Sequence, residues 1–212
     1  QRELSALTEC HFVRADLSTV EGARQLVNEA HARLGRLDTL VNNAGSFRDT
    51  DFADLDQKRF DDTFNLNVRG YLFAAQAFAA LVQPGQANAS IVCVGSTNSL
   101  AAEKNSVIYD SSKGAVLMLI RSLAVTLAPR GIRVNGIGPG IIDTPLTSAG
   151  LSAPGVRDAL LAQIPLGKIG QPVDIGGAAV FLASPQASYI TGQMLYIDGG
   201  ILANQMTWEV RT

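Results

Sequence analysis

The sequence predicts an α/β fold, in which helices cover both faces of a doubly wound parallel sheet. Two observations predict this fold. Short apolar runs of strand length alternate along the chain with helices of ten residues or more, which is the pattern of parallel sheets. The length of 212 residues also favours one domain over a set of smaller units, so we expect a single domain over residues 1–212.

Each predicted strand is a short apolar run. In chain order these runs are residues 12–15, 37–41, 90–95, 132–138 and 194–197. The run at 90–95 contains only one polar residue, Ser90. A strand that is apolar on both faces belongs in the middle of a sheet that is covered on both sides.

Each predicted helix has apolar residues at helical spacing. The helices cover residues 19–34, 57–82, 109–128, 156–163 and 173–182, and residues 2–8 are predicted to be the end of a further helix. Ser18 and Glu21 form a capping box at the start of the first complete helix. This helix is predicted to end at Gly35, and the last helix is predicted to begin at Pro172.

The composition excludes several classes of protein. Hydrophobic residues make up 47% and charged residues 17% of the chain, which indicates an ordered globular protein. A net charge of −2 predicts no nucleic-acid or anionic-membrane partner. Arg121 interrupts the best apolar stretch, so we expect no membrane span and, by default, a cytoplasmic location. His11 and His31 have no metal-ligand spacing, so no metal site is predicted.

Tyr109 and Lys113 lie four residues apart at the start of the helix over 109–128. Side chains at i and i+4 are neighbours on one face of a helix, which places a phenol beside an ammonium. A nearby cation lowers the pKa of a tyrosine, so we expect Tyr109 to exchange protons near neutral pH. Ser96 follows the strand at 90–95, at the carboxyl edge of the sheet where open α/β sheets bind ligands.

Four other motifs stand in a fixed order around these residues. They are Asn42-Asn43-Ala44-Gly45, Asn67-Val68-Arg69-Gly70, Pro139-Gly140 with Thr144 beyond, and Asp198-Gly199-Gly200. Together with the Tyr–Lys pair they resemble the short-chain dehydrogenase/reductase family, from about residue 12 to residue 200. The resemblance implies a Rossmann-like, dinucleotide-binding fold, NAD or NADP as cofactor, and interconversion of a secondary alcohol and a ketone by hydride transfer.

The resemblance also implies four catalytic residues. Tyr109 would be the general acid/base and would also contact the cofactor, and Lys113 would bind the ribose of the nicotinamide nucleotide. Ser96 would hydrogen-bond the substrate oxygen, and Asn67 would distort its helix and hold a water of a proton relay. Each residue has a plainer alternative, namely a surface tyrosine, a solvated lysine, a polar turn after a strand and a satisfied structural asparagine.

Five further residues resemble the family's cofactor-binding positions. The resemblance places Asp16 and Leu17 at the adenine and Asn42 on the adenosine side. It places Ile142 and Thr144 at the nicotinamide carboxamide. An ordinary helix-entry role for Asp16 and a purely structural role for Asn42 remain alternatives.

The family opens with a strand and a glycine-rich turn that binds the cofactor pyrophosphate at a helix N-terminus. No G-x-x-x-G-x-G motif occurs in this sequence, and the residue that selects NAD or NADP belongs to the same missing region. We therefore expect the chain to be part of a longer protein. We also expect the sheet edge beside residues 37–41 to be unpaired. A protein that began at Gln1 would have poor stability and negligible cofactor affinity.

Residues 145–170 are rich in glycine, proline and serine and are predicted to form a mobile substrate lid. The polar residues after Ser96 favour a small polar substrate, such as a sugar, a polyol or a 3-oxoacyl thioester. The resemblance implies a homotetramer built through the two long helices, and residues 57–82 are apolar on more than one face. Trp208 is expected to be a packing or interface residue. The alternative function is a truncated, cofactor-free member that acts as a structural scaffold.

Overall fold

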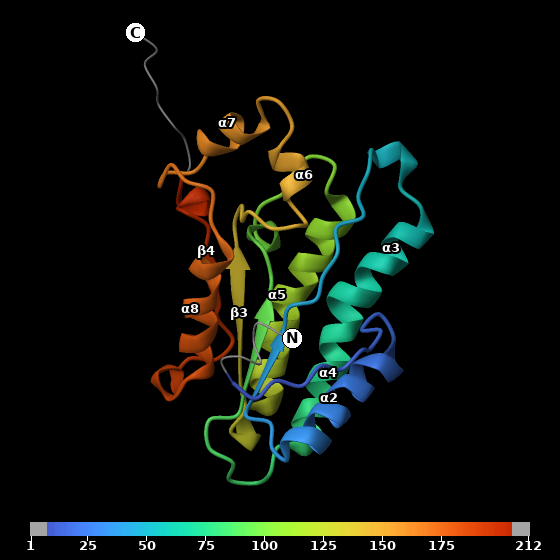
Figure 1. Cartoon of the computed structure of the whole chain (residues 1–212), viewed down its shortest axis with the longest axis vertical. Coiled ribbons are helices and arrows are strands. Elements are labelled where there is room, and N and C mark those ends of the chain that lie inside the picture. Colours follow the sequence, from blue (N-terminus) through green and yellow to red (C-terminus); the bar gives the residue numbers. More distant parts are fainter. Residues whose placement is uncertain (1–7, 205–212) are drawn as a thin grey trace.

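The computed structural model of the protein describes residues 8–204 and contains four parallel strands in the order β1-β2-β3-β4. The strands are β1 (Thr39–Asn42), β2 (Ser90–Val94), β3 (Arg133–Pro139) and β4 (Met194–Ile197). Helices join each strand to the next, so the predicted α/β class and the parallel sheet are confirmed (Figure 1). Trp208 and nearly all of the helix end predicted at residues 2–8 lie outside the described residues.

The longer helices run antiparallel to the strands and cover both faces of the sheet. They are α2 (Val20–Leu34), α3 (Gln57–Phe64), α4 (Gly70–Leu81), α5 (Val107–Leu127) and α8 (Pro172–Ala183). The short helices α6 (Ser148–Leu151) and α7 (Val156–Leu161) lie in the predicted lid, and a π-helical segment, Asn65–Arg69, joins α3 to α4. Single 3₁₀ turns occur at Phe52–Asp54, Thr97–Ser99, Ala128–Arg130, Pro185–Ala187 and Ile201–Ala203.

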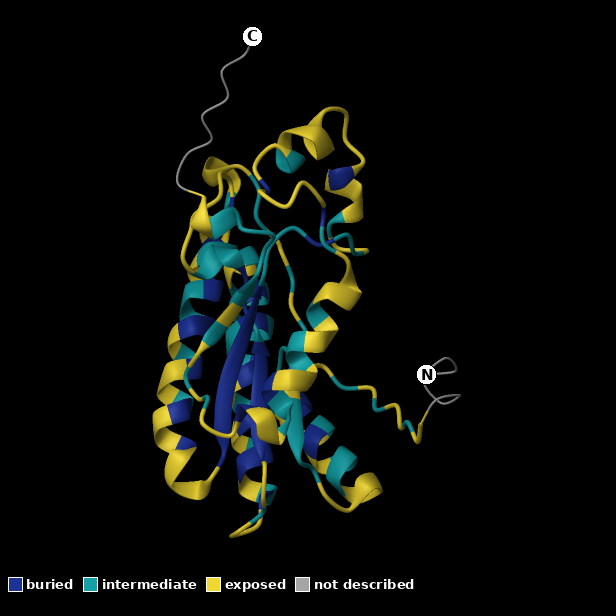
Figure 2. Cartoon of the chain, turned by 90° about the vertical axis from the view of Figure 1, so that its left-hand side faces the viewer, coloured by how far each residue is buried: buried dark blue, intermediate teal, exposed yellow. Residues whose placement is uncertain are grey.

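The alternation of side chains along β2 divides the core into two layers. Ile91 and Cys93 pack with α4 and α5 in the larger layer. Val92 packs with Leu182 of α8 on the other face. Because successive side chains of a strand point to opposite faces, this apolar run is buried on both sides, as the sequence predicts. Figure 2 shows the resulting dark-blue centre of the sheet.

The second apolar face of α4 is covered within the chain. Ala23 and Val27 of α2 are buried against α4, in the same core layer as Phe78. Gly22 allows the close approach at the start of α2, since a Cβ there would lie 2.0 Å from the carbonyl oxygen of Asp16. The apolar character of residues 57–82 therefore has an explanation inside one chain and does not by itself require a partner subunit.

In the described part of the chain, one helical stretch, Val107–Arg130, is long and apolar enough to cross a bilayer. It consists of α5 and the 3₁₀ turn that follows. Val116 and Ile120 of this helix are fully buried in the core layer beneath the sheet. This packing is that of the central helix of an α/β domain.

Two local predictions near the start of the chain are wrong. Residues 12–15 form no strand, and the carbonyl oxygen of Phe12 instead accepts a hydrogen bond from Arg33. A strand needs a neighbour for its backbone groups, and no described strand lies beside this segment. The capping box is also displaced, because Thr19 is the N-cap and its hydroxyl accepts from Gly22 N, while the Ser18 hydroxyl donates to Asp16.

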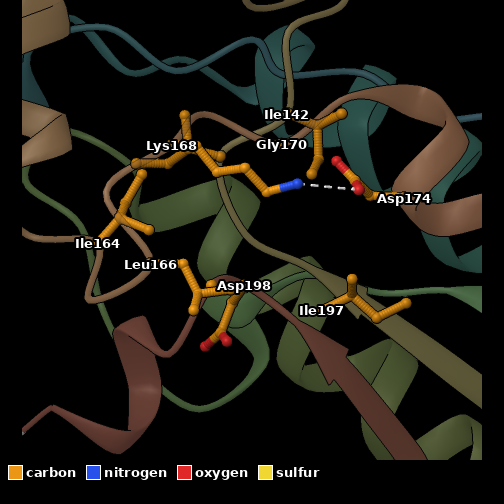
Figure 3. Close-up of a pocket in the computed structure, with 10 residues that line it drawn as sticks. Ile142, Ile164, Leu166, Lys168, Gly170, Asp174, Ile197 and Asp198 are labelled. Atoms are coloured by element: carbon orange, nitrogen blue, oxygen red, sulfur yellow. Dashed lines mark hydrogen bonds and ion pairs between the residues drawn. The ribbon is translucent and has the colours of Figure 1, made fainter.

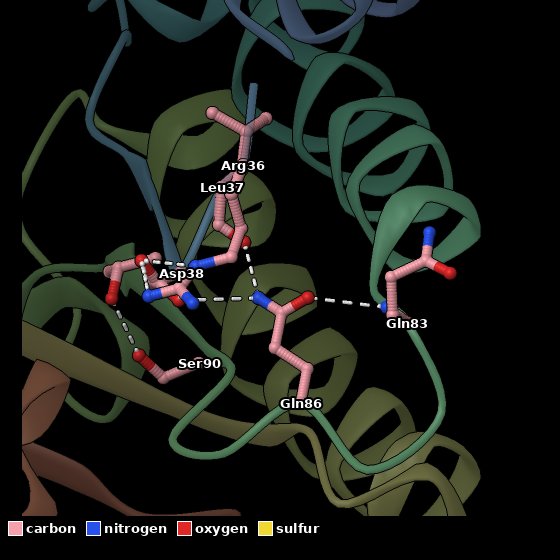
Figure 4. A network of polar contacts seen from close by, with 7 residues as sticks. Arg36, Leu37, Asp38, Gln83, Gln86 and Ser90 are labelled. Atoms are coloured by element: carbon pink, nitrogen blue, oxygen red, sulfur yellow. Dashed lines mark hydrogen bonds and ion pairs between the residues drawn. The ribbon is translucent and has the colours of Figure 1, made fainter. Parts of the chain in front are cut away.

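The amino ends of β1 and β2 are held in register by polar side chains from the loop after α4. Gln86 donates to the carbonyl oxygen of Leu37 at 2.7 Å and to the carboxylate of Asp38 (Figure 4). The hydroxyl groups of Thr39 and Ser90, which are paired across the two strands, lie 3.0 Å apart. On its other side β1 has no neighbouring strand among residues 8–204, and Val41 there is 48% exposed.

Candidate active site

The carboxyl end of β2 brings three of the predicted catalytic residues together. Ser96 lies two residues beyond β2, and Tyr109 and Lys113 lie in the first two turns of α5. The side chain of Ser96 lowers the pKa of Tyr109, and Lys113 Nζ lies 5.5 Å from the centre of the tyrosine ring. The structure therefore brings the serine, the phenol and the ammonium to one place at the edge where ligands bind in such sheets.

Lys113 is buried beneath this site, with only 4% of its surface exposed. Its ammonium donates one hydrogen bond, to the carbonyl oxygen of Val94 at 3.0 Å, and Tyr71 donates to the same oxygen at 3.2 Å. Burial lowers the pKa of Lys113 from 10.5 to about 8, because a charged group loses its hydration. The lysine stays charged at neutral pH, so a desolvated positive charge lies close to Tyr109.

The pKa of Tyr109 departs from the prediction. Burial raises it above the ordinary value of 10.0, the contact with Ser96 lowers it, and the carboxylates of Glu103 and Asp110 raise it further. The prediction of a lowered pKa is wrong for this structure, because the loss of hydration of the phenolate outweighs the favourable contacts. Tyr109 is therefore a protonated phenol at neutral pH.

Asn67 lies in the π-helical segment and is completely buried. Its side-chain oxygen accepts from Ser46 N at 2.9 Å, and its amide donates to the Ser46 carbonyl oxygen at 3.0 Å and to the Ser112 hydroxyl at 3.1 Å. Ser112 in turn donates to the carbonyl oxygen of Tyr109 at 2.7 Å. The expected distortion of the helix at Asn67 is present, and it turns this amide toward the loop after β1 and toward α5.

A polar network surrounds the Ser96 hydroxyl. Ser96 donates to Asn98 Oδ1 at 2.9 Å and accepts from Asn98 N at 3.1 Å. The Asn98 amide donates to the Asp110 carboxylate at 2.7 Å, beside Tyr109 in the sequence. The serine is thus fixed in a short turn that is anchored to α5, although its role as a substrate contact stays a prediction.

Sequence reasoning missed the contacts that the loop after β1 makes with α5. The carboxylate of Asp49 accepts hydrogen bonds from Ile108 N at 2.8 Å and Tyr109 N at 3.0 Å. The ring of Phe47 meets the ring of Tyr109 edge to face, with centroids 5.3 Å apart. The partners are about 60 residues apart in sequence, and the loop has no periodic pattern, so the sequence carried no signal for these contacts.

The residues predicted on the adenosine side fall into two groups. Leu17 and Asn42 line one cavity of about 100 Å³ beside β1 and α4. The Asn42 amide donates to the carbonyl oxygen of Tyr71 at 3.2 Å, so it also ties β1 to α4. Asp16 is exposed outside this cavity, and its carboxylate accepts from the backbone and the hydroxyl of Ser18. These bonds lower the pKa of Asp16.

The predicted carboxamide contacts lie beyond β3. Ile142 lines a second cavity, of about 160 Å³, together with Ile164, Lys168 and Asp198 (Figure 3). The hydroxyl of Thr144 lies 3.1 Å from that of Thr147. Within the described chain, neither Ile142 nor Thr144 is hydrogen-bonded to the group around Tyr109. The structure thus places these two residues in the segment that leads into the predicted lid.

The described residues contain no cluster of three or more histidine, cysteine or acidic side chains that could bind a metal ion. The groups that the structure brings together around Tyr109 are two hydroxyl groups, one ammonium and the amides around them. A partly buried phenol, a serine and a buried ammonium at the carboxyl edge of a doubly wound sheet define the class of protein: an α/β protein with the groups of an acid/base catalyst.

Comparison with known proteins gives the family. A family model described as enoyl-(acyl carrier protein) reductase matches residues 1–202. The chain is 35% identical to an L-rhamnose 1-dehydrogenase (NAD(P)(+)) of Azotobacter vinelandii, over 91% of this chain and 75% of that protein. It is 36% identical to a cyclopentanol dehydrogenase of Comamonas sp., over 92% of this chain and 78% of that protein.

A solved structure of a related enzyme indicates the same family. A gluconate 5-dehydrogenase from Burkholderia cenocepacia, in complex with NADP and tartrate, superimposes with a TM-score of 0.84 at 32% identity, covering 89% of this chain and 74% of that chain. The protein belongs to the short-chain dehydrogenase/reductase family. It is accordingly an NAD(P)-dependent oxidoreductase that acts on CH–OH groups.

The residues around Lys113 fit a nicotinamide nucleotide. Among residues 8–204, the Lys113 ammonium donates only to the carbonyl oxygen of Val94, which leaves two of its three N–H groups for ribose hydroxyls. A Cβ on Gly45 would lie 3.4 Å from Asn67 Oδ1 and 3.8 Å from Lys113 Nζ. A glycine at this position therefore leaves room beside the ammonium for a cofactor.

Proposed function

We propose that the protein interconverts a secondary alcohol and a ketone, with Tyr109 as the general acid/base. The observation that supports this most is the position of the Tyr109 ring, whose centre lies 5.5 Å from the ammonium of the buried Lys113. The nicotinamide, when bound, supplies or accepts the hydride at the substrate carbon. Tyr109 donates its phenolic proton to the carbonyl oxygen during reduction and takes it back during oxidation.

Ser96 donates a second hydrogen bond to the same substrate oxygen, which fixes the carbonyl beside the phenol. For this the serine must turn its hydroxyl proton away from Asn98 Oδ1, its acceptor in the structure. Lys113 binds the ribose of the nicotinamide nucleotide. Its positive charge stabilises the phenolate that forms when Tyr109 gives up its proton.

The hydrogen bonds of Asn67 limit how this residue can take part in the proposed proton relay. Both of its amide hydrogens are already used, by Ser46 and Ser112. A relay water can therefore be held only by oxygen atoms of this residue. We place that water between an oxygen of Asn67 and the ammonium of Lys113, and assign the amide hydrogens to holding the loop at Ser46.

The raised pKa of Tyr109 bears on whether the proposed site favours reduction or oxidation at neutral pH. Its phenol is protonated at neutral pH, which is the form that reduction of a ketone needs. Oxidation of an alcohol needs the phenolate, so its rate rises as the pH increases toward the pKa of Tyr109. Reduction is correspondingly the faster direction at neutral pH.

Replacement of Tyr109 tests the function. We expect Tyr109→Phe to lower kcat by roughly 10²- to 10⁴-fold, the usual contribution of a general acid or base, and to leave the cofactor affinity almost unchanged. Turnover is followed by NAD(P)H absorbance with L-rhamnose and with cyclopentanol. Tyr189→Phe is the matched control, because Tyr189 is fully exposed. An equal rate in the Tyr109→Phe variant would contradict the proposal.

Cofactor titration separates the enzyme from a scaffold. NADH and NADPH are added separately to the longer protein that includes the residues encoded before Gln1, and the shift of their fluorescence reports binding. Binding of one or both supports the enzyme and identifies the preferred dinucleotide. No binding of either would favour a cofactor-free structural role.

The substrate class proposed is a small polyol, sugar or cyclic alcohol. The relatives named above act on L-rhamnose, cyclopentanol and gluconate, according to their names. The polar side chains of Asn98 and Glu103 beside Ser96 suit a substrate with several hydroxyl groups. Residues 145–170 contain two short helices around a small apolar cluster of Leu151, Ile164 and Ile169, and we propose that they close over the substrate as a mobile lid.

We further propose that the protein is a cytoplasmic homotetramer. Two apolar side chains on the outer face of α5, Met118 and Val125, are 56% and 78% exposed. A second copy of the same helix would cover them in a two-fold symmetric contact. The net charge of −2 gives no support for a nucleic-acid partner.

A further inference from the structure

We infer that Asp49 is a positioning residue, which sets the place of Tyr109 by capping α5 from the loop after β1. This inference rests on the proposed role of Tyr109. The two carboxylate oxygens of Asp49 accept from two successive backbone amides, Ile108 N at 2.8 Å and Tyr109 N at 3.0 Å. One of these amides belongs to the proposed acid/base itself.

The helix α5 has no cap of its own at this end. Ser106 is the N-cap residue, but its side chain makes no capping hydrogen bond, and its buried hydroxyl has no hydrogen-bond partner within the described part of the chain. The first amides of a helix have no acceptor within the helix. Asp49 satisfies the second and third of them, and its negative charge is favourable at the positive end of the helix dipole.

The same loop contacts the site at two other points. The ring of Phe47 packs edge to face on the Tyr109 ring, and the backbone of Ser46 exchanges two hydrogen bonds with Asn67. The loop therefore holds Tyr109 by its amide and by its ring, and is itself anchored to the π-helical segment. In this arrangement, a shift of the loop moves the phenol relative to Ser96.

Loss of the Asp49 carboxylate frees the first turn of α5 at the residue that carries the phenol. A displacement of about 1 Å in an active site can cost roughly 100-fold in rate. We therefore expect Asp49→Ala to lower kcat by about 10- to 100-fold, with little change in cofactor affinity. Asp49→Asn keeps one acceptor oxygen and should lose less.

Asp51→Ala is the matched control. Asp51 lies in the same loop and accepts from the side chain of Asn105 at 2.8 Å, but it contacts no backbone amide of α5. The parent, Asp49→Ala, Asp49→Asn and Asp51→Ala proteins are compared in kcat for oxidation of L-rhamnose and cyclopentanol. Their cofactor affinities are measured by NAD(P)H fluorescence, which also gives the fraction of competent protein.

A double-mutant cycle shows whether Asp49 acts through the phenol. In the Tyr109→Phe background, Asp49→Ala should cause no further loss of rate. An equal loss in both backgrounds, or a loss no larger than that of Asp51→Ala, would overturn the inference. A reduced cofactor affinity that accounts for the whole loss would overturn it too, because that result indicates a general structural role.

Hydrogen exchange tests the geometry without turnover. The amides of Ile108 and Tyr109 should lose protection in Asp49→Ala and keep it in Asp51→Ala. If Tyr109→Phe is fully active, the proposed function fails, and this exchange result still shows whether Asp49 holds the start of α5. Unchanged protection in Asp49→Ala would overturn the inference by itself.

Discussion

At the scale of single residues, burial sets the protonation of Lys113 and Tyr109 in the site. The pKa of Lys113 falls from 10.5 to about 8 because its ammonium is desolvated, whereas desolvation raises the pKa of the neighbouring Tyr109. Burial disfavours the charged form of both groups. The pKa values of the lysine and the tyrosine therefore move apart, and the phenol of Tyr109 becomes a weaker acid than the ammonium of Lys113.

Lys113 also makes stability depend on pH. Between pH 8 and 10.5 the unfolded chain keeps this proton and the folded chain releases it, so the stability contributed by Lys113 rises with pH in that window. Below pH 8 both states are charged, and burial of the charge costs roughly 3 kcal/mol. We expect the parent protein to gain stability relative to Lys113→Met between pH 8 and 10, measured by urea unfolding.

The parent is compared with the Lys113→Met variant because burial also raises the pKa of Cys93 to about 12 and raises that of Tyr71. Those groups contribute stability that is lost as the pH rises, and they are present in both proteins. Lys104→Met is the control, since Lys104 is exposed. A parent-minus-variant difference that stays flat between pH 8 and 10 would contradict this account.

At the scale of elements, two arginines cap helices to which they do not belong. Arg133 at the start of β3 donates to the carbonyl oxygens of Leu182, Ala183 and Ser184 at the end of α8. Arg130 likewise donates to Ala79 at the end of α4. The last carbonyl groups of a helix lack partners within it. Arg133 therefore joins α8 to β3, and Arg130 joins α4 to the turn that follows α5.

Replacement of Arg133 should weaken the layer formed by α8. Arg133→Met keeps most of the apolar stem and removes three hydrogen bonds from a charged donor, one of them at 2.8 Å. We expect a loss of roughly 2–3 kcal/mol in the free energy of unfolding, seen as a lower urea midpoint. Arg121→Met, at an exposed position of α5, should change the midpoint little, and equal midpoints for the two variants would contradict the prediction.

Prediction from sequence succeeded where the signal is local. The strands at 37–41, 90–95, 132–138 and 194–197 and the helix that starts at Pro172 were found from apolar runs and helix-start signals. The strand at 12–15 was wrong, because the same apolar pattern forms a strand only when a neighbour supplies hydrogen bonds. The role of Asp49 and the cap by Arg133 depend on contacts between distant segments, which no local pattern encodes.

The site was predicted in the same uneven way. Ser96, Tyr109 and Lys113 were found from spacing and family resemblance, and the structure brings them together. The direction of the pKa of Tyr109 was wrong, because spacing reports the neighbouring charge but not the depth of burial. The catalytic roles of these residues stay predictions until the variants are measured.

At the scale of the whole molecule, apolar side chains remain uncovered on the outer face of α5. We expect the double variant Met118→Glu, Val125→Glu to form smaller species than the parent, because buried like charges would face each other across the two-fold contact. Sedimentation velocity measures the change. Leu34→Glu, at an exposed position on α2, is the control, and an unchanged mass of the double variant would contradict the proposed tetramer contact.

The π-helical segment Asn65–Arg69 has a consequence for how this protein can vary. Each residue of an α-helix turns its successor by about 100°, and a π segment inserts one extra residue into a turn. The side chains of α3 and α4 therefore point in directions that one regular α-helix would not give them. As a result α3 can face α5, while α4 faces the sheet and α2. Removal of one residue here would rotate one half against the other, whereas an exchange of side chains would leave the phase intact. Insertions and deletions should therefore be far rarer in this helix than substitutions.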